Sequence, residues 1–401
     1  MNPMKNTSAN PAIDASRRRR RAAVVAAAGL LLLAACGTSS DATSTTSDGS
    51  TTTGAAPTEE SSARFPDATK LDAAIEAAMT DASIPGAIVG IWAPDGEYVK
   101  TFGVADEATG APMKLDFYHR IGSISKTFTT AALLILADQG KLSLDDPISK
   151  YMPGVPSGDE ITLRNLARMS SGLTTYDDSD EFADGYFTDP SQSYTPTQML
   201  SYALDKPAKF EAGTEFSYSN TNTTLIGLVV EKVSGQTLAE FVTENILAPL
   251  KMTHTSYPTT AQIPNPHAQG YTKVGDTEEL ATNWNPSWGW AAGNMISTLE
   301  DMKIWAHEIG TGSLLAPQTQ QERINSNVPW GDDANYGLGI FDVDGWLGHA
   351  GSIFGYQTLV MYLPEQQTSV VFFTNTDAPH NASTTLGKAI TEVISPNHVY
   401  Q

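Results

Sequence analysis

The sequence predicts a mixed α/β (α+β) fold, in which one antiparallel sheet is built from both chain ends, is flanked by helices and carries an all-α insertion. Two observations favour this architecture. Strand-like segments lie near the beginning of the chain, over 87–102, and near its end, over 348–374. The residues between them have mainly helical periodicity. Strands at both ends with helices between them suggest a single sheet that pairs the two ends of one domain.

The first expected element is a short amphipathic helix over Leu71–Met79. Two strands follow, Ala87–Trp92 and Tyr98–Phe102, and the turn-forming sequence Pro94-Asp-Gly96 separates them. Apolar and β-branched runs on both sides of such a turn predict a β-hairpin.

The middle of the chain is expected to be rich in helices. An apolar helix is predicted from Ser123 to Gln139, and the segment Lys141–Pro147 ends its periodicity. A second apolar helix is predicted over Thr223–Val233.

The last part of the chain is predicted to return to the sheet. Gly348–Val360 and Thr368–Thr374 alternate or run apolar, as strands do, and a final helix is predicted over Ala382–Ile394.

The first 36 residues resemble an export signal that ends in a lipidation site. Arg17–Arg21 are basic, Ala22–Ala35 form an apolar run too short to span a membrane, and Leu33-Ala-Ala-Cys36 resembles a bacterial lipobox. We therefore predict a lipoprotein signal peptide over 1–35, with Cys36 as the lipidated residue that anchors the protein to the outer face of the cytoplasmic membrane. The alternative is a secretory signal with an incidental cysteine, and the choice between Sec and twin-arginine export stays open.

Residues Thr38 to Ser62 are mainly Ser, Thr, Gly and acidic residues. Such a composition cannot bury a core, so residues 36–64 are predicted to form a disordered Ser/Thr-rich tether. Residues 65–401 are predicted to form the folded domain.

Charge and cysteine content restrict the possible partners. The formal net charge of −21 argues against nucleic acid and against electrostatic docking on anionic lipid, so membrane contact is expected through the lipid anchor only. Cys36 is the only cysteine, and the seven histidines form no H-x-x-x-H pair. No cofactor and no metal are therefore expected, and the oligomeric state stays open.

Ser123 and Lys126 form the first candidate catalytic pair. Residues three apart share one face of a helix, so Ser123 Oγ and Lys126 Nζ can meet. A serine becomes a good nucleophile when a base takes its proton, and a lysine can be that base if burial and nearby positive charge lower its pKa. A helix N-terminus also directs free backbone N–H groups toward an oxyanion. The alternative is a helix-capping serine followed by a surface lysine.

Two later segments accompany this pair, Tyr218-Ser-Asn220 and His349-Ala-Gly351-Ser352. Together with Ser123-x-x-Lys126 they resemble the three motifs of the serine β-lactamase and penicillin-binding-protein superfamily, in its class C β-lactamase-like branch. The resemblance covers roughly residues 67–395 and implies a β-lactamase/transpeptidase-like fold. The flanking segments that also match are Arg120–Phe128, Leu163–Leu173, Phe216–Asn220, Trp288–Gly293 and Tyr336–Gly339.

The resemblance implies a role for each residue of the first two motifs. Ser123 would be the acylating nucleophile and Lys126 its proton acceptor. Tyr218 would exchange a proton with the leaving group and act as base in deacylation, for which Lys126 would have to lower its pKa; the alternative is a core tyrosine. Asn220 would orient Lys126 and the substrate amide, or else cap the following helix.

The third motif would complete the site from an inner strand. Gly351 would let the substrate backbone approach closely, and the Ser352 N–H would join that of Ser123 in binding the oxyanion. His349 stands where β-lactamases usually have a lysine. Because a neutral histidine is a weaker partner for a substrate carboxylate, this favours the carboxypeptidases and esterases of the family over an efficient β-lactamase.

Trp288 belongs to an aromatic cluster over Trp284–Trp290. It is expected either to wall the substrate cleft and contact an apolar acyl group, or to pack the domain surface.

These assignments predict an extracytoplasmic serine hydrolase that forms an acyl-enzyme on Ser123. Its acyl donor would be a small molecule or peptide: a D-alanyl peptide, an ester or a β-lactam. D-alanyl-D-alanine carboxypeptidase-like or esterase activity is the first expectation, and β-lactamase activity is the alternative. The competing class is a non-catalytic cell-envelope binding or scaffold lipoprotein, against which intact Ser123, Lys126, Tyr218 and His349-x-Gly351 argue.

Overall fold

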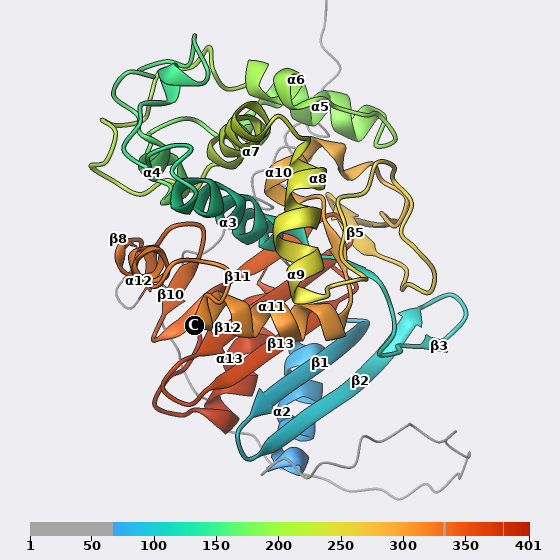
Figure 1. Cartoon of the computed structure of the whole chain (residues 1–401). Coiled ribbons are helices and arrows are strands. Elements are labelled where there is room, and N and C mark those ends of the chain that lie inside the picture. The colour runs from blue at the N-terminus through green and yellow to red at the C-terminus, as the bar shows by residue number, and fades with distance from the viewer. Residues whose placement is uncertain (1–66, 332–333, 380) are drawn as a thin grey trace, which may run out of the picture.

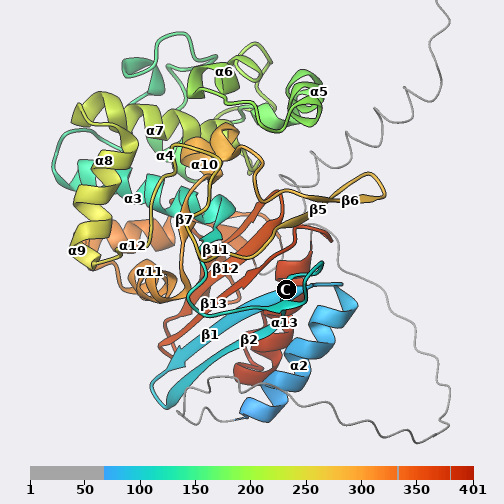
Figure 2. The ribbon, with the colours of Figure 1, turned by 90° about the vertical axis from the view of Figure 1, so that its right-hand side faces the viewer.

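The computed structural model describes residues 67–331, 334–379 and 381–401. The predicted signal peptide, Cys36 and the tether over 36–64 lie outside the described residues. Within the described part, a helical region lies against one side of a large sheet, and two further helices cover the opposite side (Figures 1 and 2).

Most strands belong to one antiparallel sheet at the centre of the protein. The strands are β1 (Gly86–Ala93), β2 (Gly96–Asp106), β3 (Ala111–Pro112), β4 (His119–Arg120), β5 (Tyr271–Val274), β6 (Thr277–Leu280), β7 (Ile296–Ser297), β8 (Val328–Pro329), β9 (Ala334–Tyr336), β10 (Phe341–Val343), β11 (Trp346–Ile353), β12 (Tyr356–Leu363) and β13 (Thr368–Thr374). The large sheet has the order β3-β2-β1-β13-β12-β11-β10-β9-β8, and β4–β7 and β5–β6 form two small pairs. Strand β1 pairs directly with β13, with Ala87 opposite Thr374. The prediction of one antiparallel sheet built from both chain ends is therefore confirmed.

Helices cover both faces of this sheet. Helices α2 (Ala68–Asp81) and α13 (Ala382–Ile394) pack on one face and on each other, and α11 (Leu299–Thr311) packs on the other face (Figure 2). Helix α13 buries Ala382, Leu386 and Ile390 at four-residue spacing, as an amphipathic helix does. Because both faces are covered, β12 and β13 are buried along their whole length.

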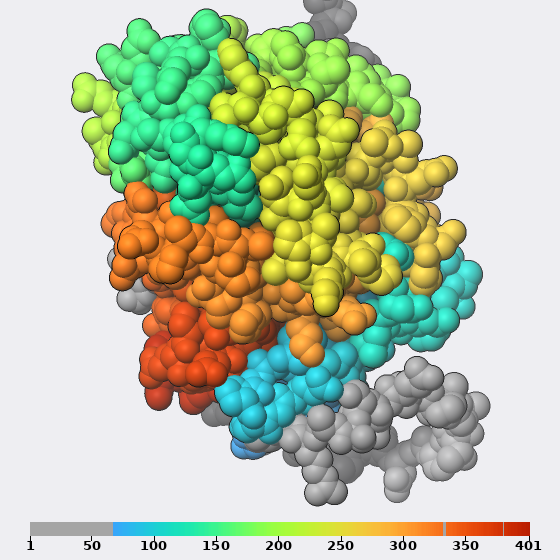
Figure 3. Space-filling model, in the orientation of Figure 1, coloured from blue at the N-terminus to red at the C-terminus, as the bar shows by residue number. Residues whose placement is uncertain are grey.

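The helical insertion is built around two buried helices, α3 (Ser125–Asp138) and α7 (Asn220–Ser234), which pack on each other (Figure 1). Helix α3 is buried from Ser125 to Leu136, so other parts of the protein cover it on all sides. Figure 3 shows the green and yellow helical region in contact with the blue and red sheet region, with orange segments between them. The other helices are α4 (Leu163–Ala167), α5 (Asp180–Thr188), α6 (Pro196–Ser201), α8 (Leu238–Val242), α9 (Ala248–Leu250), α10 (Trp290–Gly293) and α12 (Pro317–Asn325).

The structure refines the predicted boundaries in two places. The predicted strand region over 348–360 is a hairpin, because the chain turns at Phe354-Gly355, where Gly355 has a φ of +86°. Ser123 lies in a 3₁₀ turn, η1 (Gly122–Ile124), and α3 begins only after it. The short strands β8, β9 and β10 were not predicted, since runs of two or three residues carry little periodicity.

The backbone of β11 approaches the turn η1 closely. A Cβ atom on Gly351 would lie 2.1 Å from Ile121 O and 3.1 Å from Ser123 N, and one on Gly122 would lie 2.7 Å from Ser352 N. Atoms do not approach so closely without displacement, so both positions require glycine. Gly351 was expected to make room for the substrate backbone; the turn η1 occupies that space instead.

Gly122→Ala should therefore destabilise the protein more than Gly110→Ala does. Both glycines have a positive φ, +51° and +70°, but a Cβ atom on Gly110 would meet nothing within 4 Å. The alanine at 110 should cost about 1 kcal/mol of left-handed strain, and the alanine at 122 roughly 1–3 kcal/mol more from its collision with β11. Urea unfolding of both variants measures the difference. Equal losses would show that the close approach of β11 to η1 is not a constraint.

Candidate active site

Ser123 and Lys126 meet as the sequence predicts. Lys126 Nζ donates hydrogen bonds to Ser123 Oγ at 2.9 Å and to the Ala292 carbonyl oxygen at 2.7 Å. It also lies 4.8 Å from the centre of the Tyr218 ring. The first two motifs thus come together where η1, α3, α10 and the segment before α7 converge.

Burial lowers the pKa of Lys126, so that the amine can act as a base. The side chain is 0% exposed, and desolvation lowers its pKa to about 7, against the opposing effect of the Asp177 carboxylate. A substantial share of Lys126 is therefore neutral at neutral pH and can accept the Ser123 proton. The expectation that positive charge would help is wrong, because the nearby charge is negative.

Tyr218 has a different protonation state from the one expected. Burial raises its pKa above the ordinary value, Asp177 raises it further, and a hydrogen bond with the Ser123 side chain lowers it only partly. The expectation that Lys126 lowers the pKa of Tyr218 is wrong, because the cause with the largest effect is desolvation of the phenolate. Tyr218 therefore stays a phenol at neutral pH, and it can pass a proton but does not rest as a phenolate base.

The edge of β11 supplies a backbone N–H group next to the nucleophile. Strand β11 pairs with β10 over 346–348 and with β12 over 347–353. In a hairpin with a two-residue turn, the two residues that flank the turn are joined by a pair of backbone hydrogen bonds. Along each strand, alternate residues then bond to the neighbouring strand on one side or on the other. Gly348 therefore bonds to β10, and Ile353 bonds to β12. By the same alternation, Ser352 directs its N–H toward the edge that β10 leaves uncovered, where η1 lies. The backbone N–H groups of Ser123 and Ser352 therefore both lie where η1 meets β11, as an oxyanion hole requires.

His349 is neutral, and both of its ring nitrogens have protein partners. Nδ1 lies against the Ala350 carbonyl oxygen, which can only accept, so Nδ1 carries the proton. Nε2, at 2.9 Å from the Tyr336 hydroxyl, then accepts from it. Burial, together with Lys126, lowers the pKa of His349 to about 3. The third motif therefore offers no positive charge to a substrate carboxylate.

Asn220 is the first residue of α7, and its backbone and its side chain have different surroundings. Its backbone N–H donates to Thr175 Oγ1 at 3.0 Å. Burial raises the pKa of the Asp177 carboxyl, and the neighbouring Asn220 side chain opposes this only in part. The Asn220 Oδ1 atom is buried without a partner. Within the described part of the chain no hydrogen bond joins Asn220 to Lys126, so the expected role in orienting that lysine has no support. The alternative of a side-chain cap is also absent, because Ser219 is the N-cap residue.

Asp177 is a site residue that sequence reasoning missed. It is 3% exposed, and its charge acts on Lys126 and on Tyr218. It follows the matched segment 163–173, but Asp178, Asp180 and Glu181 stand beside it and are exposed. Nothing in the sequence separates one buried acid from exposed neighbours of the same type.

Trp288 lies in a buried aromatic cluster. It is 7% exposed and packs with Phe182, Tyr186 and Phe354. Its backbone carbonyl accepts a hydrogen bond from Tyr176 at 3.0 Å. This placement corresponds to the packing alternative, in which the cluster supports the segment that carries Ala292.

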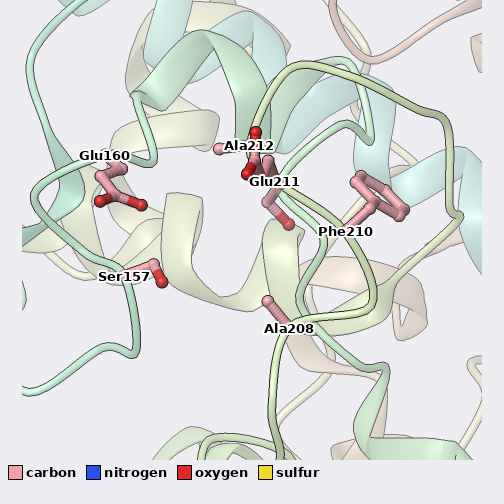
Figure 4. A pocket seen from close by; sticks show the side chains of 7 residues that line it. Ser157, Glu160, Ala208, Phe210, Glu211 and Ala212 are labelled. Atoms are coloured by element: carbon pink, nitrogen blue, oxygen red, sulfur yellow. The ribbon is translucent and has the colours of Figure 1, made fainter.

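A separate surface pocket of about 310 Å³ is lined by none of the motif residues (Figure 4). Glu160 lies on one side of it and Glu211 on the other (Figure 4). Across the described residues, no three or more His, Cys, Asp or Glu side chains are grouped so that they could hold a metal ion. In the same part of the chain, no helix is long and apolar enough to cross a membrane.

Comparisons with known proteins identify the class to which this fold and site belong. The Beta-lactamase family model matches residues 71–393, so the chain belongs to that family, within the serine-hydrolase superfamily of penicillin-binding-protein and β-lactamase type.

Individual relatives agree with this assignment. Protein flp of Staphylococcus aureus (strain NCTC 8325 / PS 47) is 26% identical over 322 residues, which cover 78% of this chain and 64% of that protein. The chain thus spans less than two thirds of that relative. The putative penicillin-binding protein PbpX of Bacillus subtilis (strain 168) is 27% identical over 70% of this chain and 68% of its own length. A D-stereospecific amidohydrolase from Streptomyces sp. has a similar structure, with a TM-score of 0.74 and 29% identity over 82% of this chain and 99% of its own.

The pKa of Lys126 predicts the pH dependence of acylation. Activity requires the neutral amine, so kcat/KM should rise with pH through a midpoint near 7 and should be lost below it as Lys126 becomes protonated. The measurement is kcat/KM for an uncharged ester between about pH 5 and about pH 9. A flat profile across that range, or one with a midpoint near the ordinary lysine value, would contradict the assignment of Lys126 as the base.

Proposed function

We propose that the protein is an extracytoplasmic serine hydrolase that cleaves D-alanyl peptides or esters through an acyl-enzyme on Ser123. The observation that carries the proposal is the 2.9 Å contact between Ser123 Oγ and a fully buried lysine amine whose pKa is lowered to about 7. A nucleophile with a base of matched pKa is what acyl transfer at neutral pH needs.

Each step has a group in position to perform it. Lys126 takes the Ser123 proton as Oγ bonds to the acyl carbon, and the N–H groups of Ser123 and Ser352 stabilise the oxyanion. The bond to the leaving group then breaks, and Tyr218, hydrogen-bonded to Ser123, passes the proton to it. In deacylation a water molecule gives a proton to Lys126 as its oxygen bonds to the acyl carbon, the bond between the acyl carbon and Ser123 Oγ breaks, and the proton returns from Lys126 to Oγ.

The type of bond follows from the third motif and from the relatives. Because His349 is neutral and both of its nitrogens are occupied, a substrate carboxylate gains no charged partner there. This supports esters and open-chain amides over β-lactams of the penicillin type, which carry a carboxylate. The amidohydrolase relative supports the same choice, since its name records cleavage of amide bonds.

Ser123→Ala should abolish turnover and covalent labelling while the protein stays folded. Intact-protein mass spectrometry after exposure to a fluorophosphonate should show a single adduct on the wild type and on Ser201→Ala, which alters an exposed serine of α6, and a penicillin should label both proteins more slowly. Loss of a nucleophile typically lowers the rate by several orders of magnitude, so residual hydrolysis above about 1% would overturn the proposal. An adduct on Ser123→Ala would do the same.

We also propose that Cys36 carries a lipid that anchors the protein to the outer face of the cytoplasmic membrane. The motif Leu33-Ala-Ala-Cys36 after a basic and apolar leader supports this. Cys36→Ser should move the protein from the membrane fraction to the soluble fraction of a bacterial host that processes lipoproteins. Retention of the variant with membranes would contradict the anchor.

A further inference from the structure

Both ring nitrogens of His349 have partners, and one partner is a buried tyrosine to which the proposed reaction gives no role. Tyr336, in β9, is 0% exposed, and its hydroxyl lies 2.9 Å from His349 Nε2. The other nitrogen, Nδ1, lies against the Ala350 carbonyl oxygen. A carbonyl oxygen only accepts, so Nδ1 carries the proton and the tyrosine hydroxyl donates to Nε2. Each nitrogen of the neutral ring therefore has a partner of the matching type.

Another buried histidine, His119, shows what this hydroxyl contributes. His119 also has Nδ1 near the carbonyl oxygen of the next residue, Arg120, at 2.7 Å, but its Nε2 lies 3.0 Å from a second carbonyl oxygen, that of Thr374. A neutral imidazole has one donor and one acceptor, so it can satisfy only one of these two carbonyl groups. At His349 both nitrogens are satisfied in the neutral form, because the hydroxyl of Tyr336 can donate.

Tyr336 is itself held in place. Two residues further along the chain, Leu338 N donates to the carbonyl oxygen of Arg323, on α12, at 3.0 Å. The ring of Tyr336 packs against those of Phe216 and Trp330, with distances of 5.7 Å and 6.1 Å between ring centres. A hydroxyl on a ring that neighbours fix in this way can hold its own partner in one orientation.

The rings of His349 and Tyr336 both lie next to Tyr218. The centre of the Tyr218 ring is 6.1 Å from that of His349 and 6.3 Å from that of Tyr336, and Lys126 Nζ is 4.8 Å from the same centre. Tyr218 therefore contacts the base and both of these rings. Because Tyr218 passes the proton to the leaving group in the proposed reaction, a displaced His349 ring would disturb a group that takes part in it.

We propose that Tyr336 is a positioning residue that fixes His349 through the hydrogen bond to Nε2. His349 is then held in the Nδ1–H tautomer and in one orientation, in which it supports Tyr218, donates to the Ala350 carbonyl oxygen and does not act as an acid or base. The inference rests on the proposed acyl-enzyme at Ser123 and adds a residue to its machinery. Tyr336 acts through His349 and is not itself a catalytic residue.

The protonation of the two nitrogens can be measured without a substrate. In NMR spectra of protein that carries isotope-labelled histidine, the chemical shifts of the ring nitrogens show which of them is protonated, and His349→Gln identifies the His349 signals by their loss. Wild type should have the proton on Nδ1 between about pH 6 and about pH 8. In Tyr336→Phe the two shifts should move toward each other, because a ring held at one nitrogen exchanges between orientations and tautomers. Unchanged shifts, or a wild type protonated on Nε2, would overturn the inference.

Kinetics of Tyr336→Phe, which loses the hydroxyl and keeps the ring, test the effect on the reaction. For an uncharged ester, kcat should fall by about tenfold and KM should change by less than about twofold, because a displaced proton-transfer group slows the reaction more than it weakens binding. Tyr98→Phe is the matched control: Tyr98 is also buried, and its hydroxyl donates to Asp72 at 2.7 Å, on the β1–β2 hairpin side of the protein. Its kcat should stay within about twofold of wild type. An unchanged kcat in Tyr336→Phe, or equal losses in both variants, would contradict the positioning role.

A double-mutant cycle shows whether Tyr336 acts through His349. In a His349→Gln background, Tyr336→Phe should lower kcat by less than about twofold, because the ring that the tyrosine holds is no longer present. A further tenfold loss in the double variant would show that the two residues act independently, and the inference would fail.

Failure of this inference can be told apart from failure of the proposed function. If a fluorophosphonate labels Ser123 but the His349 shifts do not respond to Tyr336→Phe, the positioning role is wrong and the proposed serine hydrolase stands. If no acylating reagent labels Ser123, the proposed function fails, and the role of Tyr336 in the reaction fails with it.

Discussion

The burial of one lysine amine is the constraint on which the rest of this site depends. A protonated ammonium is costly in a buried site, so desolvation, against the opposing effect of Asp177, brings the pKa of Lys126 to about 7 and places a usable base beside Ser123. The helical insertion makes this possible, since α3 is buried on all sides and α10 provides the Ala292 carbonyl as a second partner. The same burial acts on every neighbour: it keeps Tyr218 a phenol and His349 a neutral imidazole. One physical effect therefore sets the protonation states of all three motifs.

The second requirement is a close contact between the backbones of η1 and β11, which are far apart in the sequence. The nucleophile turn follows the first hairpin, whereas β11 belongs to the C-terminal half of the sheet, and the direct pairing of β1 with β13 brings both into one body. At the junction, Gly351 and Gly122 allow an approach that no side chain would permit. The start of β10 at Phe341 matters equally, because a strand that paired with β11 beyond Gly348 would consume the Ser352 N–H that faces the turn. The oxyanion hole is thus a product of strand length, strand alternation and two glycines.

Sequence reasoning predicted what local spacing and motif order determine, and it failed where depth of burial decides. The contact of Ser123 with Lys126 follows from helical spacing, and the hairpin over 87–102 follows from its turn. A sequence pattern predicts neither the direction in which the pKa of Tyr218 shifts nor that Asp177, among adjacent acids, is the buried one. Both depend on which groups lose contact with water on folding. The same limit applies to Trp288, whose residue type fits a cleft wall and a packed core equally well. Fold class and motif residues were therefore accessible, and the electrostatics of the site were not.

The third motif shows how the protonation state of one residue changes what that residue does in the site. Ala350 alternates along β11 with Gly348 and Ser352, so its carbonyl oxygen points to the uncovered edge where an oxyanion would form. A bare carbonyl there would repel the developing negative charge. His349 Nδ1–H donates to this oxygen, and Tyr336 holds the ring in the tautomer that makes the donation possible. A lysine ammonium would act on the substrate directly. A neutral histidine acts on the backbone instead, where it reduces the negative potential beside the oxyanion hole.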